Sequence, residues 1–365
     1  MLLFIKIKKL PSIAWPPLSR DSVHIVHICL LTNQDLDDPL LAERDWPCDP
    51  RPFIPDADWH LAVLGNKASA PTQVEDLICN GVNGHHIDVF FNLCDGAADQ
   101  PDLPGIEVVE MMELHGVAFT GATSECYEPT RIEMKDACAR LGIAAPAYVF
   151  ARTEEDIEHA AQTMTFPLFV KHYSSYASVD LSRRSKVMTP AGLRIQARKI
   201  ISRHGAALIE QYIDGIECTV LVAENPDDPR NPTTYTPVQY EFPEGEHFKH
   251  SDLKWINFED LSTKPVEDQN LDARLRDEVA RFFVEIRGAS FGRCDLRVDR
   301  TGTPYMLEIN ANCGVFFAPS AYGSADFCLS LDPDGHEGFA RQLVAAACAR
   351  HAKRPPSLSQ DAGAI

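Results

Sequence analysis

One stretch of the chain, residues 292–310, constrains the fold more than any other, because it sets charged side chains into an otherwise apolar β pattern. Its sequence, GRCDLRVDRTGTPYMLEIN, predicts two strands around a central Thr-Gly turn. A turn centred there pairs Asp295 with Glu308 and Arg293 with Asn310. Strand alternation then predicts that these four share one face. The opposite, apolar face is predicted to carry Cys294, Leu296, Leu307 and Ile309.

The polar face of this hairpin predicts a cation site. Directly opposed β-carbons lie roughly 5 Å apart, and two carboxylates at that spacing repel unless positive charge lies between them. Carboxylate and amide oxygens are ligands that suit Mg²⁺. We therefore predict that Asp295, Glu308 and Asn310 bind magnesium. The alternative is a surface hairpin whose polar face is merely solvated, and a slip of one residue in the pairing would favour it.

Composition narrows the class of protein. With 365 residues the chain has room for two or three domains. Its net charge of -19 and lack of Lys and Arg clusters argue against a nucleic-acid partner. The leader, residues 1–21, begins with an apolar run too short to span a bilayer, so no membrane partner is expected. Eleven scattered cysteines indicate reduced thiols and a cytoplasmic protein.

The expected elements divide the chain into three folded units. Residues 22–126 alternate apolar β-branched runs with a helical pattern, which predicts an open α/β domain. Thr130 and Glu133 form a capping box that opens a helix, and residues 127–215 predict a small α+β module. Residues 216–352 are strand-rich and then helical, and a frayed tail, residues 353–365, follows.

Further blocks extend the pattern over much of the chain. The hairpin is followed by ANCGVF and preceded, in order, by FNLCDG, IEMKDACARLGIAAPAYVF, FPLFVKHYSSYASVDLS, ALIEQYIDGIECTV and FPEGEHFKHSDLKW. Together, from about residue 86 to 320, they resemble the ATP-grasp superfamily in its D-alanine:D-alanine ligase-like branch. The resemblance implies an α/β, ATP-grasp fold with an α+β lid. Its three domains would hold a nucleotide between the central and C-terminal ones.

The resemblance also implies contacts to the nucleotide phosphates. Lys135 and Lys171 would contact them, with help from the loop residues Ser174, Ser175 and Ser178, the last of these counted with the catalytic residues. From the residues alone, the alternative for Lys135 is a solvated surface lysine. The alternative for the serine loop is a plain surface turn, because it lacks the glycines usual in the family.

A second group of residues would surround the nucleoside. The resemblance places Glu210, Tyr212 and Ile213 along the adenine and Glu217 at the ribose hydroxyls, for which a carboxylate is a suitable acceptor. A strand with alternating polar residues would look the same. Lys254, in a polar lid-like loop, would approach the γ-phosphate as a catalytic residue.

The chemistry implied by the resemblance joins a carboxylate to an amine through an acyl phosphate. Asp295, Glu308 and Asn310 would hold two Mg²⁺ ions, for which Mn²⁺ could substitute. Arg293 and the Gly314 backbone N–H would stabilise the developing negative charge. The implied partners are ATP, a small-molecule carboxylate, and an amine or amino acid. A homodimer is common in the family.

The chain departs from the D-alanine-using members around the first substrate. It lacks their N-terminal Gly-Gly turn and glutamate, and it has Cys94 and Cys313 where they have histidine and proline. We therefore expect ligation of another carboxylate rather than D-Ala-D-Ala synthesis. Pocket candidates are Cys94, Asp95, Phe316, Phe317 and Tyr322, although aromatics after a strand are more often core.

Two other functions stay open at this point. One is an ATP-grasp kinase that phosphorylates a small metabolite, and the other is a nucleotide-binding module without catalysis. The presence of Arg293, Asp295 and Glu308 together disfavours the second, because a non-catalytic module has no need of them.

Overall fold

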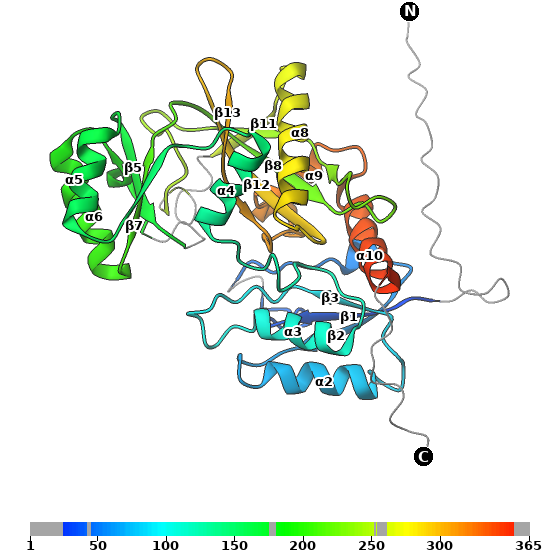
Figure 1. Ribbon diagram of the computed structural model, residues 1–365. Coiled ribbons are helices and arrows are strands. Elements are labelled where there is room, and N and C mark those ends of the chain that lie inside the picture. Colours follow the sequence, from blue (N-terminus) through cyan, green and yellow to red (C-terminus); the bar gives the residue numbers. More distant parts are fainter. Residues whose placement is uncertain (1–24, 42–44, 175–179, 252, 254–260, 354–365) are drawn as a thin grey trace, which may run out of the picture.

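The computed structural model describes residues 25–41, 45–174, 180–251, 253 and 261–353. Three β-sheets divide this part of the chain into an N-terminal, a central and a C-terminal unit. In Figure 1 the central unit stands to one side, and the N-terminal unit lies beneath the C-terminal one. None of the helices within the described ranges is both long and apolar enough to cross a membrane.

The N-terminal unit is built on a parallel sheet in the order β2-β1-β3. Its elements are β1 (His27–Thr32), the short helix η1 (Arg51–Phe53), β2 (Asp58–Val63), α2 (Ala70–Asn80), β3 (Val89–Asn92) and α3 (Ile106–His115). Parallel strands need cover on both faces. Helices α2 and α3 cover one face, and the other face joins a core shared with the C-terminal unit.

Helix α4 (Arg131–Leu141) connects the N-terminal and central units. Thr130 and Glu133 form the predicted capping box, and Gly142 ends the helix in the left-handed region at a φ of 67°. The predicted boundary at residue 127 grouped this helix with the central unit. Its buried apolar side chains pack with the C-terminal sheet and helix α8 (Gln269–Glu285), and its buried Lys135 pairs with Glu210 of the central sheet.

The central unit is a four-stranded antiparallel sheet in the order β4-β7-β5-β6. Its elements are β4 (Tyr148–Ala151), α5 (Glu154–Thr163), β5 (Leu168–His172), η2 (Arg183–Ser185), β6 (Lys186–Val187), α6 (Pro190–His204) and β7 (Ala207–Gln211). Alternate residues such as Val170 and Ile209 pack under α5 and α6. Strand alternation therefore turns Lys171 and Glu210 to the uncovered face.

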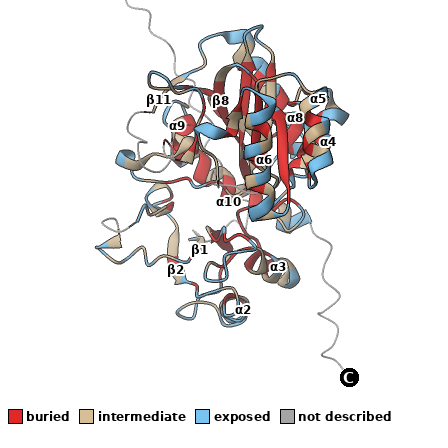
Figure 2. Cartoon of the chain, turned by 90° about the vertical axis from the view of Figure 1, so that its left-hand side faces the viewer, coloured by how far each residue is buried: buried red, intermediate tan, exposed pale blue. Residues whose placement is uncertain are grey.

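The C-terminal unit contains the longest strands, in the order β11-β10-β8-β12-β13, with β9 paired to β8. The strands are β8 (Gly215–Ala223), β9 (Thr233–Thr234), β10 (Val238–Glu241), β11 (Ser262–Pro265), β12 (Phe291–Asp299) and β13 (Pro304–Asn310). The helices that follow are η4 (Pro319–Ala321), α9 (Ser324–Ser330) and α10 (Gly335–Lys353). Helices α4 and α8 cover one face and α9 and α10 the other, so the strands lie in a buried layer (Figure 2).

Strands β12 and β13 form the predicted hairpin, with one irregularity. Arg293 pairs with Asn310 and Asp295 with Glu308, as the turn position predicted. Beyond that point the register shifts by one residue, so that Leu296 faces Met306. The prediction that Leu307 lies on the apolar face is wrong, because this bulge inserts an extra residue there. Met306 enters the core in its place, and Leu307 lines a cavity beside Glu308.

Candidate active site

A cavity of about 110 Å³ lies between the central and C-terminal sheets, on the polar face of the hairpin. Arg293, Asp295, Glu308 and Asn310 all line it. Five of the predicted nucleotide-binding residues also line it, namely Lys171, Glu210, Tyr212, Ile213 and Glu217. The hairpin is therefore not a solvated surface feature, and residues far apart in the sequence meet around one enclosed space.

An arginine holds each of the two hairpin carboxylates that line this cavity. Arg293 donates to both oxygens of Asp295, at 3.0 and 2.9 Å, and the Thr219 hydroxyl donates to Oδ1 at 2.8 Å. Burial raises the pKa of Asp295, but Arg293 and the other nearby donors outweigh it and hold the pKa at about 2. Glu308 forms an ion pair with Arg131, which outweighs burial and lowers the pKa of Glu308. Both carboxylates are therefore ionised at neutral pH.

The donor set of this face fits a hard divalent cation. Asp295 and Glu308 are opposed in the sheet, ionised and half-buried, and the Asn310 amide nitrogen lies 3.3 Å from Asp295 Oδ2. All three offer oxygen ligands to the same cavity, which is the chemistry that Mg²⁺ prefers. Arg131 supplies the positive charge beside Glu308. Arg131 was not among the predicted site residues, because it lies 177 residues away from Glu308 in the chain.

Two lysines share one carboxylate at the rim of this cavity. Glu210 Oε1 lies 2.6 Å from Lys135 Nζ, and Glu210 Oε2 lies 2.7 Å from Lys171 Nζ. All three residues are at most 6% exposed. Burial raises the pKa of Glu210, but the two ammonium groups outweigh it and bring the pKa to about 2. The side-chain carboxylate of Glu210 therefore orients the two lysines. Only the backbone groups of Glu210 are left to contact an adenine ring.

A second network of buried side chains connects the residues predicted to contact the nucleoside. Arg297 donates to the Ile213 carbonyl at 2.7 Å and to Glu217 Oε2 at 3.0 Å. Its guanidinium also lies 5.0 Å from the Tyr212 ring centroid, and Lys186 Nζ lies 4.0 Å from the same centroid. Arg297 was missed at the sequence level. Its spacing of two and four residues from Asp295 and Arg293 is the signal that could have identified it.

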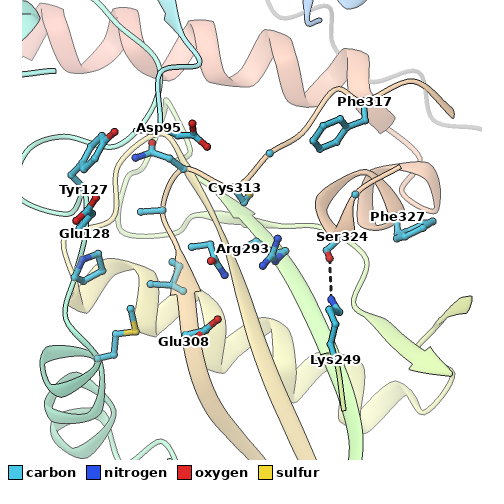
Figure 3. Close-up of a pocket in the computed structure, with 18 of the residues that line it drawn as sticks. Asp95, Tyr127, Glu128, Lys249, Arg293, Glu308, Cys313, Phe317, Ser324 and Phe327 are labelled. Atoms are coloured by element: carbon cyan, nitrogen blue, oxygen red, sulfur yellow. Dashed lines mark hydrogen bonds between the residues drawn. The ribbon is translucent and has the colours of Figure 1, made fainter. Parts of the chain in front are cut away.

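A larger cavity, of about 530 Å³, adjoins the first at the hairpin (Figure 3). The two cavities share Arg131, Lys249, Arg293, Glu308 and Asn310 among their lining residues. Lys249 donates to the Ser324 hydroxyl at 3.2 Å, a contact drawn in Figure 3. Lys249 is a further cation that the sequence analysis did not select.

The remaining predicted positions divide between this cavity and other places. Gly314 and Ser174 line the large cavity, while Ser175, Ser178 and Lys254 lie outside the described residues. Of the three aromatic candidates, Phe317 and Tyr322 line the large cavity. Phe316 is instead buried in the shared core, with a φ of 70°.

Asp95 and Cys94 lie at a third cavity of about 190 Å³, next to the large one. Asp95 lines both cavities and is exposed there, and desolvation by the surrounding protein raises its pKa to about 6. Cys94 is only 3% exposed, and burial raises the pKa of its thiol. A thiol held protonated in this way is not an activated nucleophile.

The chain belongs to the family described as "D-ala D-ala ligase C-terminus", which matches residues 138–324. With this family, the ATP-grasp fold of the D-alanine:D-alanine ligase-like branch is confirmed as the architecture. The matched range contains the hairpin strands β12 and β13 and the strand β5 that carries Lys171, and it begins within helix α4 just after Lys135. The class of protein that the fold and the site define is therefore an ATP-grasp, ligase-like protein.

Individual relatives agree with this assignment. The chain is 28% identical over 238 residues to "Uncharacterized protein y4sG" of Sinorhizobium fredii, covering 62% of this chain and 66% of that protein. It is 28% identical over 212 residues to the D-alanine–D-alanine ligase of Xanthomonas axonopodis pv. citri, covering 56% of this chain and 63% of that protein. The chain thus spans under two thirds of either relative's length.

Solved structures share the fold over nearly the whole chain. The crystal structure of the D-alanine–D-alanine ligase from Bacillus anthracis complexed with ATP superposes with a TM-score of 0.60 at 14% identity. The likeness covers 90% of this chain and 99% of that one. It therefore includes the N-terminal unit, which lies outside the range that the family matches.

Proposed function

We propose that this protein is an ATP- and Mg²⁺-dependent ligase that joins a carboxylic acid to an amine or amino acid. One observation carries the proposal. A small cavity lined by the buried Lys171 and by a divalent-cation donor set meets, at Arg293, a larger cavity of about 530 Å³, and Lys135 lies beside it on the same Glu210 carboxylate. A nucleotide in the small cavity and an acceptor in the large one would therefore both contact the charged side chains that line the two cavities.

The small cavity is the proposed ATP site. Lys135 and Lys171 would bind phosphate oxygens, and Glu217 would accept from the ribose hydroxyls. Asp295, Glu308 and Asn310 would hold Mg²⁺, which would neutralise phosphate charge when bound. ATP in the Bacillus anthracis ligase of the same fold supports this assignment.

The proposed reaction takes place where the two cavities meet. A carboxylate oxygen of the first substrate attacks the γ-phosphorus, and ADP leaves with the electrons of the broken P–O bond. The amine of the second substrate then attacks the acyl carbon, and inorganic phosphate leaves as the amide forms. The Nε and Nη2 groups of Arg293 donate to Asp295, so we assign its remaining guanidinium N–H groups, with the Gly314 N–H, to the developing oxyanion.

We further propose that the first substrate is a carboxylate other than D-alanine. The two departures that support this, Cys94 and Cys313, both line the third cavity beside the proposed reaction centre. Asp95, at the same place, adds a carboxyl group that could receive a cationic or hydrogen-bonding part of that substrate.

The test is ADP release with Mg-ATP across a panel of carboxylic acids and amines that includes D-alanine, with mass spectrometry of each active mixture. The proposal predicts ADP only when an acid and an amine are both present, with a product lighter by one water than the two combined. ADP with only a phosphorylated product would indicate a kinase. ATP binding without turnover in any mixture would favour a nucleotide-binding module, and D-alanyl-D-alanine would contradict the proposed substrate.

ATP affinity should fall as the pH rises above about 8. Burial, helped by the nearby Arg131, lowers the pKa of Lys171 to about 8, so its ammonium loses its proton above that pH. Loss of a charged phosphate contact should weaken ATP binding about tenfold. Isothermal titration calorimetry from pH 6.5 to 9.5 measures this. In the control variant Lys171→Arg the guanidinium stays charged, so the fall should disappear. A fall that persists in this variant would contradict the assignment.

Magnesium and ATP should stabilise the fold cooperatively. Asp295 and Glu308 are opposed like charges, so a cation bound between them relieves repulsion and adds a ligand for the phosphates. The melting temperature should rise more with both ligands than the sum of the rises with each alone. Glu308→Ala should remove that excess in differential scanning fluorimetry. An identical excess in wild type and variant would show that Glu308 does not bind the metal.

A further inference from the structure

Two histidines and an aspartate converge at the end of the N-terminal sheet that lies away from the cavities. His27 and Asp58 are the first residues of β1 and β2 and pair directly in the parallel register. His60 lies two residues beyond Asp58, so strand alternation places it on the same face. The opposite ends of β1 and β3, at Thr32 and Asn92, line the third cavity. This cluster is therefore separate from the candidate active site.

The distances between the potential ligand atoms match one coordination geometry. His27 Nδ1 lies 3.0 Å from Asp58 Oδ2 and 3.4 Å from His60 Nε2, and Asp58 Oδ2 lies 3.6 Å from His60 Nε2. With metal–ligand bonds of roughly 2.0–2.1 Å, neighbouring ligands are about 3.4 Å apart in a tetrahedron. In an octahedral arrangement with the same bond lengths they would be only about 2.9 Å apart. The observed spacings favour the tetrahedron.

The surroundings keep these side chains in place. His60 is 8% exposed, and the His85 ring stacks on that of His27 with centroids 4.5 Å apart. The Asp88 carboxylate accepts from the His27 backbone N–H at 2.9 Å, which fixes the start of β1.

We propose that His27, Asp58 and His60 form a binding site for a zinc-class divalent metal ion. Imidazole and carboxylate ligands at these spacings suit Zn²⁺, and among the described residues these three side chains supply its ligand atoms. The ion joins the first residues of two neighbouring strands, so it stabilises the start of the N-terminal sheet. The inference does not depend on the proposed ligase activity.

Zinc binding to the full chain tests this site. Isothermal titration calorimetry with Zn²⁺, in excess Mg²⁺ to fill oxygen-ligand sites, should give one Zn²⁺ per chain. Co²⁺ as a probe should give the intense visible absorption of a tetrahedral complex. Loss of an outer-shell partner already costs 10–100-fold in metal affinity, so loss of a direct ligand should cost about 100-fold or more. His60→Ala and Asp58→Asn should each show that loss.

The control is His351→Ala, which removes an exposed imidazole of helix α10. It should bind Zn²⁺ as the wild type does. If His60→Ala does not fold, as judged by circular dichroism, Asp58→Asn decides, because its side chain keeps the same volume. Absence of wild-type binding, or equal binding by Asp58→Asn and wild type, would overturn the site. The second result would mean that the metal sits adventitiously elsewhere on the surface.

Discussion

Asp295→Asn should lower the rate of ADP release by about 10³-fold. The Asp295 carboxylate is held ionised by Arg293 and Thr219 and faces the proposed phosphate site. An amide has no charge to hold a divalent cation there, and removing one preorganised electrostatic group commonly costs 10²–10³-fold in rate. Loss of a metal ligand should lie at the upper end of that range.

The measurement must separate lost chemistry from lost stability. Without Asp295 the partly buried Arg293 loses its carboxylate partner, which destabilises the fold. ADP release is therefore measured well below the melting temperature of the variant, alongside ATP binding without metal. Asp227→Asn, an exposed aspartate in the loop after β8, is the matched control and should leave the rate unchanged. Turnover retained in Asp295→Asn would show that the hairpin is not the metal site.

Glu210→Gln should lower the free energy of unfolding by about 3–5 kcal/mol. It leaves the ammonium groups of Lys135 and Lys171 buried side by side without an anion, which is the costly way to break a buried ion pair. Urea unfolding at pH 7 measures the loss. Removing one ammonium as well, in Glu210→Gln with Lys135→Met, should recover part of it because the repulsion disappears.

The chain offers a matched comparison for this prediction. Glu241 pairs with Lys264 at 2.7 Å, the same distance as in the buried pair, but both side chains are more than 40% exposed. Glu241→Gln should cost less than about 1 kcal/mol. Equal costs for the two substitutions would contradict the view that Glu210 compensates buried charge. The pKa of Glu210 is lowered from 4.5 to about 2, so its contribution is present above pH 4.5 and lost as pH falls toward 2.

The sequence predicted the hairpin because its information is local. A Thr-Gly turn and strand alternation are enough to pair Arg293 with Asn310 and Asp295 with Glu308. The bulge at Leu307 could not be predicted in the same way. Each strand still shows its own alternation of apolar and polar residues in the sequence. The extra residue of a bulge is revealed only when the two strands are paired.

Contacts between distant elements were the part that the sequence could not supply. Arg131 reaches Glu308 only because α4 packs on the C-terminal sheet rather than in the central unit. Lys135, on the same helix, reaches across to Glu210 on β7 of the central unit. His27 and His60 lie on separate strands, and their approach depends on a parallel register that no local turn fixes.

Oxygen-18 transfer is the measurement that tests the central claim most directly. An acid and amine pair that supports turnover is used with ¹⁸O in the carboxylate, and the released phosphate is analysed by mass spectrometry. Attack of the carboxylate on ATP predicts one ¹⁸O atom in the phosphate for each amide formed, and loss of both products in Asp295→Asn. An amide formed with unlabelled phosphate would contradict the acyl phosphate route proposed for this site.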